Sequence, residues 1–403
     1  MHRIRTATAA IGILGALALA LTACAPGSNA TSQGSDPGSS SASNNWFNQA
    51  EFDQQKSERT AHFDGDPSKP YLQQLPGQKS VPAGKYTASG PQKVCFSNAA
   101  LDNTWRQTGW ITMNQQLKVL HDQGVISSLE ARDAQADDDK QVADIDYFIS
   151  EGDCGAYIIA PNSSKATAPA VQRACDTGKP VIIFDRDAGV DCETSFVHSV
   201  GNYAWGIDSG SFIVDHVKKG AHVVALRTQA GVDLFEQRWA AAQHVFDQAG
   251  VKYTQYITGA DPTKIKNTIT DEIAKGDIAA VWVDLGDQSP AVVEAFEDAG
   301  KDIPIVTGED NLAYLRTWKD KGFEGFGAVY PAFQWRTALL AVGMLFQGKS
   351  IPANWVLPQQ PITKDDLDSV LAKNKGMPDG QWASFGGEDL PGYPQIWQKR
   401  VIP

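Results

Sequence analysis

The sequence predicts an α/β fold made of two doubly wound, parallel-sheet lobes with a ligand cleft between them. From Val94 onward, short β-branched runs alternate with amphipathic stretches of roughly 12 to 18 residues, which is the pattern of βαβ units on a parallel sheet. Several of these stretches end at a glycine, the usual stop signal of a helix. Ten predicted strands exceed one doubly wound sheet, and they divide into near-equal halves around residues 200–202.

The elements follow one another in regular order. The predicted strands are Val94–Ser97, Ile126–Ala131, Ala156–Ala160, Val181–Asp185, Ser195–Val200, His222–Leu226, Lys252–Ile257, Ala279–Asp284, Ile303–Thr307 and Gly325–Tyr330. The predicted helices are Trp105–Asp122, Asp139–Ser150, Lys165–Thr177, Tyr203–Lys218, Leu234–Ala249, Pro262–Lys275, Pro290–Ala299, Ala313–Lys321 and Gln334–Gln347. We therefore expect a first lobe of residues 93–200 plus 331–353 and a second of residues 201–330 plus 354–375.

The N-terminus is typical of an exported, anchored protein. Arg3 and Arg5 precede an apolar stretch that is too short to span a bilayer, and Leu-Thr-Ala-Cys ends it at Cys24. This box resembles the lipobox of bacterial lipoproteins, in which the cysteine receives the lipid. We expect residues 1–23 to be a signal peptide and Cys24 to be lipidated. The alternatives are an ordinary secretory signal with a chance cysteine and an uncleaved anchor.

Three further segments flank or precede the lobes. Residues 24–45, rich in Ser, Gly, Ala, Asn and Pro, predict a lipid-anchored flexible tether that lets the body sit roughly 25 Å from a membrane. Residues 46–92 have too few apolar side chains for a core, and we expect an arm along the first lobe, with a short helix at its start. Residues 376–403 predict a C-terminal packing tail. The formal net charge of -12 gives the chain no reason to bind nucleic acid.

Four cysteines remain once Cys24 is assigned to lipid, and an even number in an exported protein predicts disulfides. Three pairings are possible. Cys95 and Cys154 lie near the starts of strands, whereas Cys175 ends a helix and Cys192 precedes the next strand. We expect Cys95–Cys154 and Cys175–Cys192. A metal site is the alternative, but the cysteines lack CxxC spacing and no histidine lies beside them.

Polar and aromatic side chains gather at the carboxyl ends of the predicted strands. The segments are 98–106, 185–187, 229–238, 284–288 and 309–311, together with Tyr330. Carboxylates accept from hydroxyl groups, arginines donate in a fixed fork, and aromatic rings cover the C–H face of a sugar ring. This mixture favours a polyhydroxylated ligand. Asp185-Arg186 is the sharpest element, although a solvated ion pair in a loop would look the same.

Several of these runs resemble type I periplasmic sugar-binding proteins of the ribose/galactose-binding group. The similarity covers about residues 93–352 and is carried by VIIFDR at 181–186, DTGKP at 176–180, GDCGAYIIAP at 152–161, the run 280–301 and the loop 231–238. The resemblance implies two lobes joined by three hinge strands, closing on one sugar that is passed to the permease subunits of an ABC importer. It also implies a monomer that acts without a cofactor or catalysis.

The resemblance also implies roles for individual residues. Asn103 would contact a sugar hydroxyl and Trp105 would stack on the ring, unless Trp105 is a core tryptophan at a helix start. Asp185 and Arg186 would hold hydroxyl groups from the first lobe. Arg238 and Asp310 would act from the second lobe.

Three positions depart from the family pattern. Leu285-Gly286 stands in place of Asn-Asp, with Asp284 and Asp287 on either side, and we include Asp284 among the ligand-binding candidates. Arg106 replaces an aromatic residue and would either favour an acidic group, such as a sugar acid, or face solvent. Val329 replaces a hinge glutamine before Tyr330-Pro331. These departures make a ribose-like ligand doubtful without affecting the general mechanism.

One motif points elsewhere. Residues 343–350, GMLFQGKS, match the P-loop pattern, but they continue an apolar helix and end in a glycine cap, so we reject a nucleotide site. The expected function is extracytoplasmic binding of a monosaccharide or polyol for an ABC importer. The alternatives are a sugar sensor that presents its ligand to a membrane receptor or kinase, and a secreted glycosidase that uses paired carboxylates.

Overall fold

The computed structural model describes residues 46–383 and 386–398. The predicted signal peptide, Cys24 and the tether lie outside these residues. Within the described part, two separate parallel sheets form the cores of two lobes, as expected. We call the six-stranded sheet and its helices the first lobe and the five-stranded sheet and its helices the second lobe.

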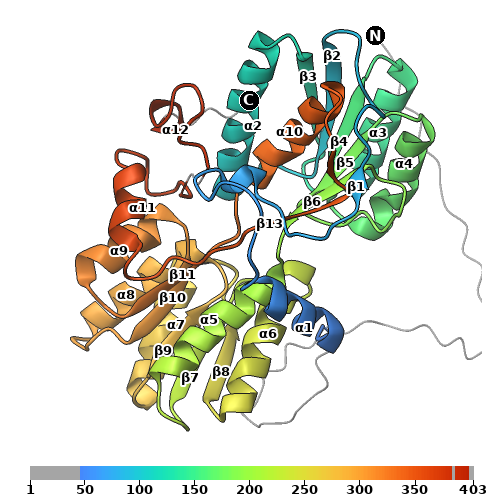
Figure 1. Cartoon of the computed structure of the whole chain (residues 1–403). Helices are drawn as coiled ribbons and strands as arrows, with labels where there is room; N and C mark the ends of the chain where they lie inside the picture. Colours follow the sequence, from blue (N-terminus) through green and yellow to red (C-terminus); the bar gives the residue numbers. More distant parts are fainter. Residues whose placement is uncertain (1–45, 384–385, 399–403) are drawn as a thin grey trace, which may run out of the picture. The chain divides into compact units, whose positions relative to one another are not determined.

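The first lobe has the strand order β13-β6-β5-β4-β2-β3. Its strands are β2 (Gln92–Asn98), β3 (Ile126–Asp133), β4 (Ala156–Ala160), β5 (Val181–Phe184), β6 (Ser195–Ser199) and β13 (Asn354–Leu357). Helices α2 (Thr104–Asp122) and α10 (Gln334–Phe346) cover one face, and α3 (Asp138–Glu151) and α4 (Ser164–Asp176) cover the other (Figure 1). The alternation of β2 explains these layers, since Val94 and Phe96 pack toward α10 while Cys95 packs toward α3.

The second lobe has the strand order β11-β10-β9-β7-β8. Its strands are β7 (His222–Arg227), β8 (Lys252–Ile257), β9 (Ala280–Val283), β10 (Ile305–Glu309) and β11 (Gly325–Ala328), and its helices are α5 (Asn202–His216), α6 (Asp233–Ala249), α7 (Pro262–Lys275), α8 (Ser289–Asp298) and α9 (Leu312–Lys321). Val223 and Trp282 pack against α5 and α6, whereas Val224 and Val281 pack against the helices of the opposite face. Nearly continuous apolar strands are what a parallel sheet covered on both faces requires.

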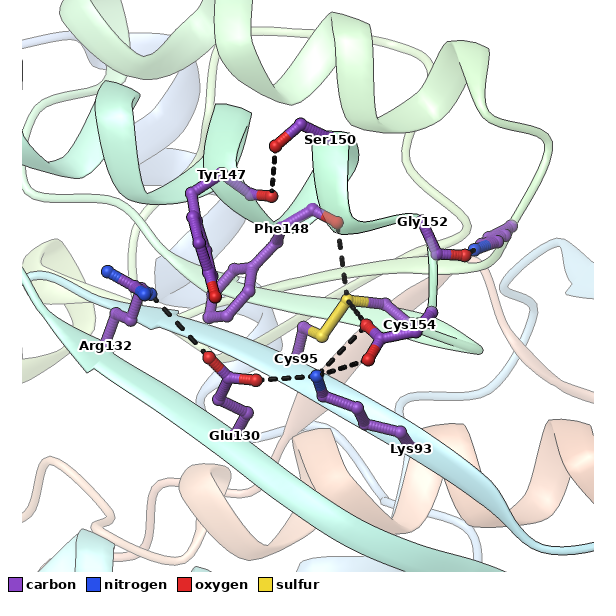
Figure 2. Close-up of a disulfide and its surroundings, with 11 residues drawn as sticks. Lys93, Cys95, Glu130, Arg132, Tyr147, Phe148, Ser150, Gly152 and Cys154 are labelled. Atoms are coloured by element: carbon purple, nitrogen blue, oxygen red, sulfur yellow. Dashed lines mark hydrogen bonds and ion pairs between the residues drawn. A yellow bond between two sulfur atoms is a disulfide. The ribbon is translucent and has the colours of Figure 1, made fainter.

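Both expected disulfides are present, which confirms the predicted pairing. Cys95–Cys154 joins β2 to the loop before β4, and Cys175–Cys192 joins the end of α4 to the loop before β6. Figure 2 shows the first disulfide under the end of α3, with Lys93 beside it. The Lys93 Nζ atom lies 2.6 Å from Glu130 and 2.8 Å from Asp153. Both disulfides lie within the first lobe, since all four cysteines belong to it.

The chain crosses between the lobes three times. The crossings follow β6, β11 and β13, at residues 200–201, 329–333 and 358–361. Gly201, with a positive φ of 141° that favours glycine, exchanges two hydrogen bonds with the Gln359 side chain, which ties the first crossing to the third. We expected residues 354–375 in the second lobe, but β13 pairs in parallel with β6 at the edge of the first sheet. The chain leaves the first lobe only after Leu357.

The N-terminal arm differs from the expectation in one part. Helix α1 (Gln49–Glu58) packs on α5 and α6 of the second lobe, where Phe52 is buried beside Tyr203, and Arg59 forms an ion pair with Asp208. Farther on, β1 (Ser80–Val81) pairs with β12 (Ile351–Pro352) on the first lobe. The arm therefore contacts both lobes, through apolar packing of α1 on the second and through strand pairing on the first.

Residues 377–383 of the C-terminal tail form a segment that we call the strap. On the second lobe, Gln381 O accepts from Leu312 N at 2.9 Å, and Ala383 N donates to Asp310 O at 2.8 Å. On the first lobe, Thr108 Oγ1 donates to Gln381 Oε1 at 2.7 Å, and Trp382 Nε1 donates to Thr104 Oγ1 at 2.9 Å. Gln381 thus bridges the two lobes, with its backbone on one and its side chain on the other.

The rest of the tail continues over the first lobe and back to the second. Arg336 of α10 binds Asp389 at 2.7 Å and stacks on Tyr71 of the arm. Two short helices, α11 (Leu367–Lys373) and α12 (Gln395–Gln398), contribute to the apolar core of the second lobe, where Trp397 is buried. None of the helices described in the structure has both the length and the apolar character that crossing a bilayer requires.

Candidate ligand-binding site

The loop from β2 to α2 supplies the first group of predicted ligand residues. Asn103 caps α2, since its Oδ1 atom accepts from Arg106 N at 3.0 Å, and its side chain is exposed. Trp105 Nε1 donates to the backbone oxygen of Tyr330 at 2.7 Å. Arg106 is 5% exposed, and burial lowers its pKa while nearby Asp185 opposes that effect. Arg106 therefore faces the interior of the site rather than solvent.

Asp185 and Arg186 follow β5 and adopt an unusual backbone. Asp185 has φ of 71°, in the left-handed region that residues other than glycine seldom occupy. This turn aims its buried carboxylate at Arg106, whose Nη2 atom lies 3.4 Å from Asp185 Oδ2. Arg186 Nη1 donates to the backbone oxygen of Asn162 at 2.6 Å. The two neighbouring residues are held by different partners, so they are more than a solvated ion pair.

Arg238 and Glu309 form a buried pair in the second lobe. Arg238 Nη1 donates to Glu309 Oε1 at 2.6 Å and to the backbone oxygen of Asp284 at 2.8 Å. The guanidinium also lies 4.4 Å from the ring centre of Trp205, within the range of a cation–π contact. Burial raises the pKa of Glu309, and the positive charge of Arg238 opposes this. Glu309 and the backbone oxygen of Asp284 therefore fix the orientation of the Arg238 guanidinium, the group that the sequence predicts to contact the ligand.

Asp284 and Asp310 are buried carboxyl groups with different surroundings. Asp284 accepts from the Thr228 N–H, at 2.8 Å to Oδ2, and from the Thr228 hydroxyl, while burial raises its pKa to about 7. Neither carboxylate oxygen of Asp310 accepts a hydrogen bond of normal geometry. Burial, followed by repulsion from Glu309, raises the pKa of Asp310 well above its usual value, although nearby N–H groups of Asp310 and Tyr330 oppose the shift.

Tyr330 lies among the predicted ligand residues of both lobes. Its hydroxyl donates to Asp185 Oδ1 at 2.9 Å, its ring centre lies 5.5 Å from that of Trp105, and Arg238 lies 5.5 Å from the same ring. Trp105, Asp185 and Arg238, which come from three different loops or helices, thus surround this side chain, and Asp310 lies near the Tyr330 backbone.

The structure therefore divides the eight predicted residues into two groups. Six of them lie around Tyr330: Trp105, Arg106, Asp185, Arg186, Arg238 and Asp310. The two others have local partners, since the Oδ1 atom of Asn103 caps a helix and Asp284 binds Thr228. The sequence places Tyr330 and Glu309 at strand ends, and it gives Glu309 a role only as a carboxylate of the glycosidase alternative. Trp205 gave no signal because it lies in an apolar helix.

A separate cavity of about 690 Å³ lies on the first lobe, between α2 and the edge strand β3. Trp110, Phe96 and Leu129 form its apolar wall, and Asn98 and Asp133 lie at one end. Within the described residues, one group has the spacing of a metal site, formed by Cys95, Asp153 and Cys154, but both sulfur atoms belong to a disulfide.

The chain is similar to known solute-binding proteins. It matches the family described as periplasmic binding protein domain over residues 94–350. The ribose import binding protein of Bacillus subtilis is 29% identical over 221 residues, which cover 54% of this chain and 72% of that protein. The D-ribose/D-allose-binding protein of Pseudomonas aeruginosa is 23% identical over 220 residues, with 51% and 68% covered. A solved ABC transporter solute-binding protein of Thermobispora bispora has a TM-score of 0.62 at 22% identity, with 77% and 98% covered.

Proposed function

The chain belongs to the periplasmic binding protein domain family, and on this premise we propose that it is the extracytoplasmic solute-binding component of an ABC importer. It binds a monosaccharide or polyol by closing its lobes and delivers it to the permease. Members of this family bind solutes outside the cytoplasm rather than catalyse reactions. The relatives named for ribose and for ribose or allose support a sugar as the ligand class.

One observation carries the proposal, namely the convergence of ligand-type side chains from both lobes on one point. Trp105 and Asp185 come from the first lobe, and Arg238 and Asp310 come from the second. Both pairs lie beyond the carboxyl ends of parallel strands, where open α/β sheets bind ligands. A ligand that touches both pairs favours the arrangement that brings the lobes together, which is the differential affinity that closure needs.

The proposal includes a membrane anchor. Lipidation of Cys24 and a tether of residues 25–45 would keep the binding lobes close to the permease. The support is the Leu-Thr-Ala-Cys box, which lies outside the described residues.

A thermal-shift panel tests the proposed function. Pentoses, hexoses, polyols, sugar acids and furanoses are added to the purified protein, and a ligand at 100 times its Kd stabilises the folded state by about 2.7 kcal/mol. We expect one class to raise Tm by a few degrees. An Asp185→Asn variant tests the site, because asparagine tolerates the left-handed backbone but lacks the negative charge. This variant should lose most of the ligand-induced rise in Tm.

Two outcomes would contradict the proposal. The first is that no member of the panel shifts Tm of the wild-type protein. The second is that incubation with nitrophenyl glycosides releases nitrophenol, which would favour the glycosidase alternative.

A further inference from the structure

Tyr330 occupies the point where the two halves of the candidate site meet. It lies just after β11, immediately before Pro331, on the second of the three crossings between the lobes. The side chain is 6% exposed. Its backbone oxygen accepts from Trp105 Nε1 at 2.7 Å, so the residue is fixed to the first lobe as well. Tyr330 thus belongs structurally to both lobes.

The contacts of the Tyr330 side chain are those that the proposed function assigns to a sugar. The hydroxyl donates to Asp185 Oδ1 at 2.9 Å, and the other carboxylate oxygen faces Arg106 Nη2 at 3.4 Å. The ring packs beside the Trp105 ring and beneath the Arg238 guanidinium. One side chain therefore uses an acceptor, an aromatic surface and a second-lobe donor at the same time.

The chemistry of the Tyr330 phenol allows it to take the place of a sugar hydroxyl group. Burial, together with the negative charge of Asp185, raises the pKa of Tyr330, so the hydroxyl keeps its proton. A protonated phenol donates one hydrogen bond to a carboxylate, as a sugar hydroxyl does. The left-handed backbone at Asp185 aims the carboxylate at this hydroxyl.

We propose that the Tyr330 side chain is an internal competitor, which the ligand must displace from Asp185, Trp105 and Arg238 before it can bind. This proposal rests on the proposed function and adds a specificity determinant to it. Only a ligand with a hydroxyl group that donates to Asp185, and with a C–H face for Trp105, replaces every contact that is lost. Simple carboxylic acids and apolar compounds lack either the hydroxyl donor for Asp185 or the C–H face for Trp105, so the site rejects them.

The proposal predicts an unusual gain of affinity in a variant. Tyr330→Phe removes the hydrogen bond to Asp185 from the ligand-free protein, while the ligand-bound protein has already lost it. Because a typical intramolecular hydrogen bond contributes modestly to stability, we expect the variant to bind about three- to tenfold more tightly. The ligand-free variant should also melt at a lower temperature than the wild type.

The measurement is titration calorimetry with D-ribose, D-allose and myo-inositol on the wild-type protein and on two variants. Tyr253→Phe is the matched control, since its hydroxyl accepts from Gln243 and donates to Asp247 within the second lobe, at 2.8 and 3.0 Å. We expect the control to bind as the wild type does. Fluorine NMR of protein labelled with 3-fluorotyrosine gives a second readout, because the resonance that Tyr330→Phe removes should shift when ligand is added to the wild type.

The outcomes separate this proposal from the proposed function. Wild-type binding with equal or weaker binding by Tyr330→Phe, or a fluorine resonance that ligand leaves unchanged, would overturn the competitor role alone. Binding by Tyr330→Phe where the wild type shows none would support it strongly. If none of the three probes binds either protein, the proposed function fails for these ligands, and the competitor role fails with it.

Discussion

Asp310 has the least compensated carboxyl group of the candidate site. Its side chain is fully buried, and neither oxygen accepts a hydrogen bond of normal geometry. Glu309, the preceding residue, adds a negative charge that Arg238 partly balances. Desolvation of a charged carboxylate is costly, so the protonated form is favoured in the folded state. Asp310 therefore couples protonation to folding until a ligand supplies a donor.

The first prediction concerns the pH dependence of stability without ligand. The pKa of Asp310 is raised in the folded state, and that of Asp284 is raised to about 7, whereas an unfolded aspartate titrates near 3.9. The folded state thus binds more protons, and the stability from these groups is full below pH ~4 and is lost as the pH rises through ~7. We expect Tm to fall over this range and to fall less steeply in Asp310→Asn.

The control for this pH series is Asp271→Asn, on the exposed face of α7. It should leave the slope of Tm against pH unchanged. A slope in Asp310→Asn equal to that of the wild type would show that Asp310 does not titrate differently on folding.

The second prediction concerns Arg186. Because one of its nitrogen atoms is held by the backbone of Asn162 and its side chain is only half buried, the Arg186→Ala variant should fold normally. Loss of a charged hydrogen bond, at roughly 1.5 to 3 kcal/mol, should weaken sugar binding more than tenfold. Titration calorimetry measures the effect. Arg173→Ala, which removes an exposed ion pair with Asp146, should bind normally.

Among individual residues, the sequence predicted which side chains lie at strand ends better than it predicted their contacts. The prediction put Trp105 and Asp185 beyond strands of the first sheet and Arg238 and Asp310 beyond strands of the second, and the structure brings these residues near Tyr330. It did not reveal that Asn103 would cap a helix or that Asp284 would bind the Thr228 backbone. Backbone N–H groups carry no sequence signature, so such local partners become visible only in the structure.

Among the elements, the strap has the most direct bearing on closure. Its hydrogen bonds join Leu312 and Asp310 of the second lobe to Thr104 and Thr108 of the first. These bonds can exist only while the lobes are together, so the strap favours that arrangement whether or not ligand is bound. It also lies outside residues 94–350, the part that matches the family.

The third prediction tests the strap through Gln381. Gln381→Ala removes the hydrogen bond to Thr108 and should shift the population toward separated lobes, which lowers the apparent affinity for sugar. A loss of about three- to tenfold is expected for one buried hydrogen bond. Small-angle scattering of the ligand-free variant should give a larger radius of gyration than the wild type.

Gln172→Ala is the corresponding control. The Gln172 side chain is exposed on α4 and donates a hydrogen bond to Asp176, within the same helix. It should change neither the affinity nor the scattering curve. An unchanged radius together with unchanged affinity in Gln381→Ala would rule out a role of the strap in closure.

The sequence predicted the long elements well and the connecting ones poorly. The ranges of β4, β8 and α7 agree with the expectation at both ends, because each is bounded by clear turn or cap residues. Strand β13 was not predicted, since four residues after a proline-containing turn carry little periodic signal. The two-residue strands β1 and β12 exist only as partners of each other. These two strands form because the fold brings the segments together, and the residues of either segment alone do not predict a strand.

On the scale of the whole molecule, the lobes, the arm and the tail form one body, which we propose is anchored to a membrane. The acidic composition, with a formal net charge of -12, disfavours direct attraction to anionic lipid headgroups. Under the proposed function, a covalent lipid would keep such an acidic protein near the permease. The proposed acylation of Cys24 would supply that anchor.

The fourth prediction concerns the anchor. In cells that express the full chain, Cys24→Ser should move the protein from the membrane fraction to the medium or the periplasm, because no cysteine remains to receive the lipid. Partitioning in Triton X-114, followed by immunoblotting, measures the change. Sugar affinity should stay as in the wild type, since Cys24 precedes the binding body. Retention of Cys24→Ser in the detergent phase would instead indicate an uncleaved apolar anchor.

The position of the strap in the chain has a consequence for biogenesis. An exported chain emerges from its N-terminus, so both sheets are available before residues 377–383 arrive. The strap can then dock only on lobes that have already formed the ends of α2 and α9. Docking of the strap therefore depends on earlier folding of both lobes, and a misfolded lobe would leave the strap loose and open to proteases.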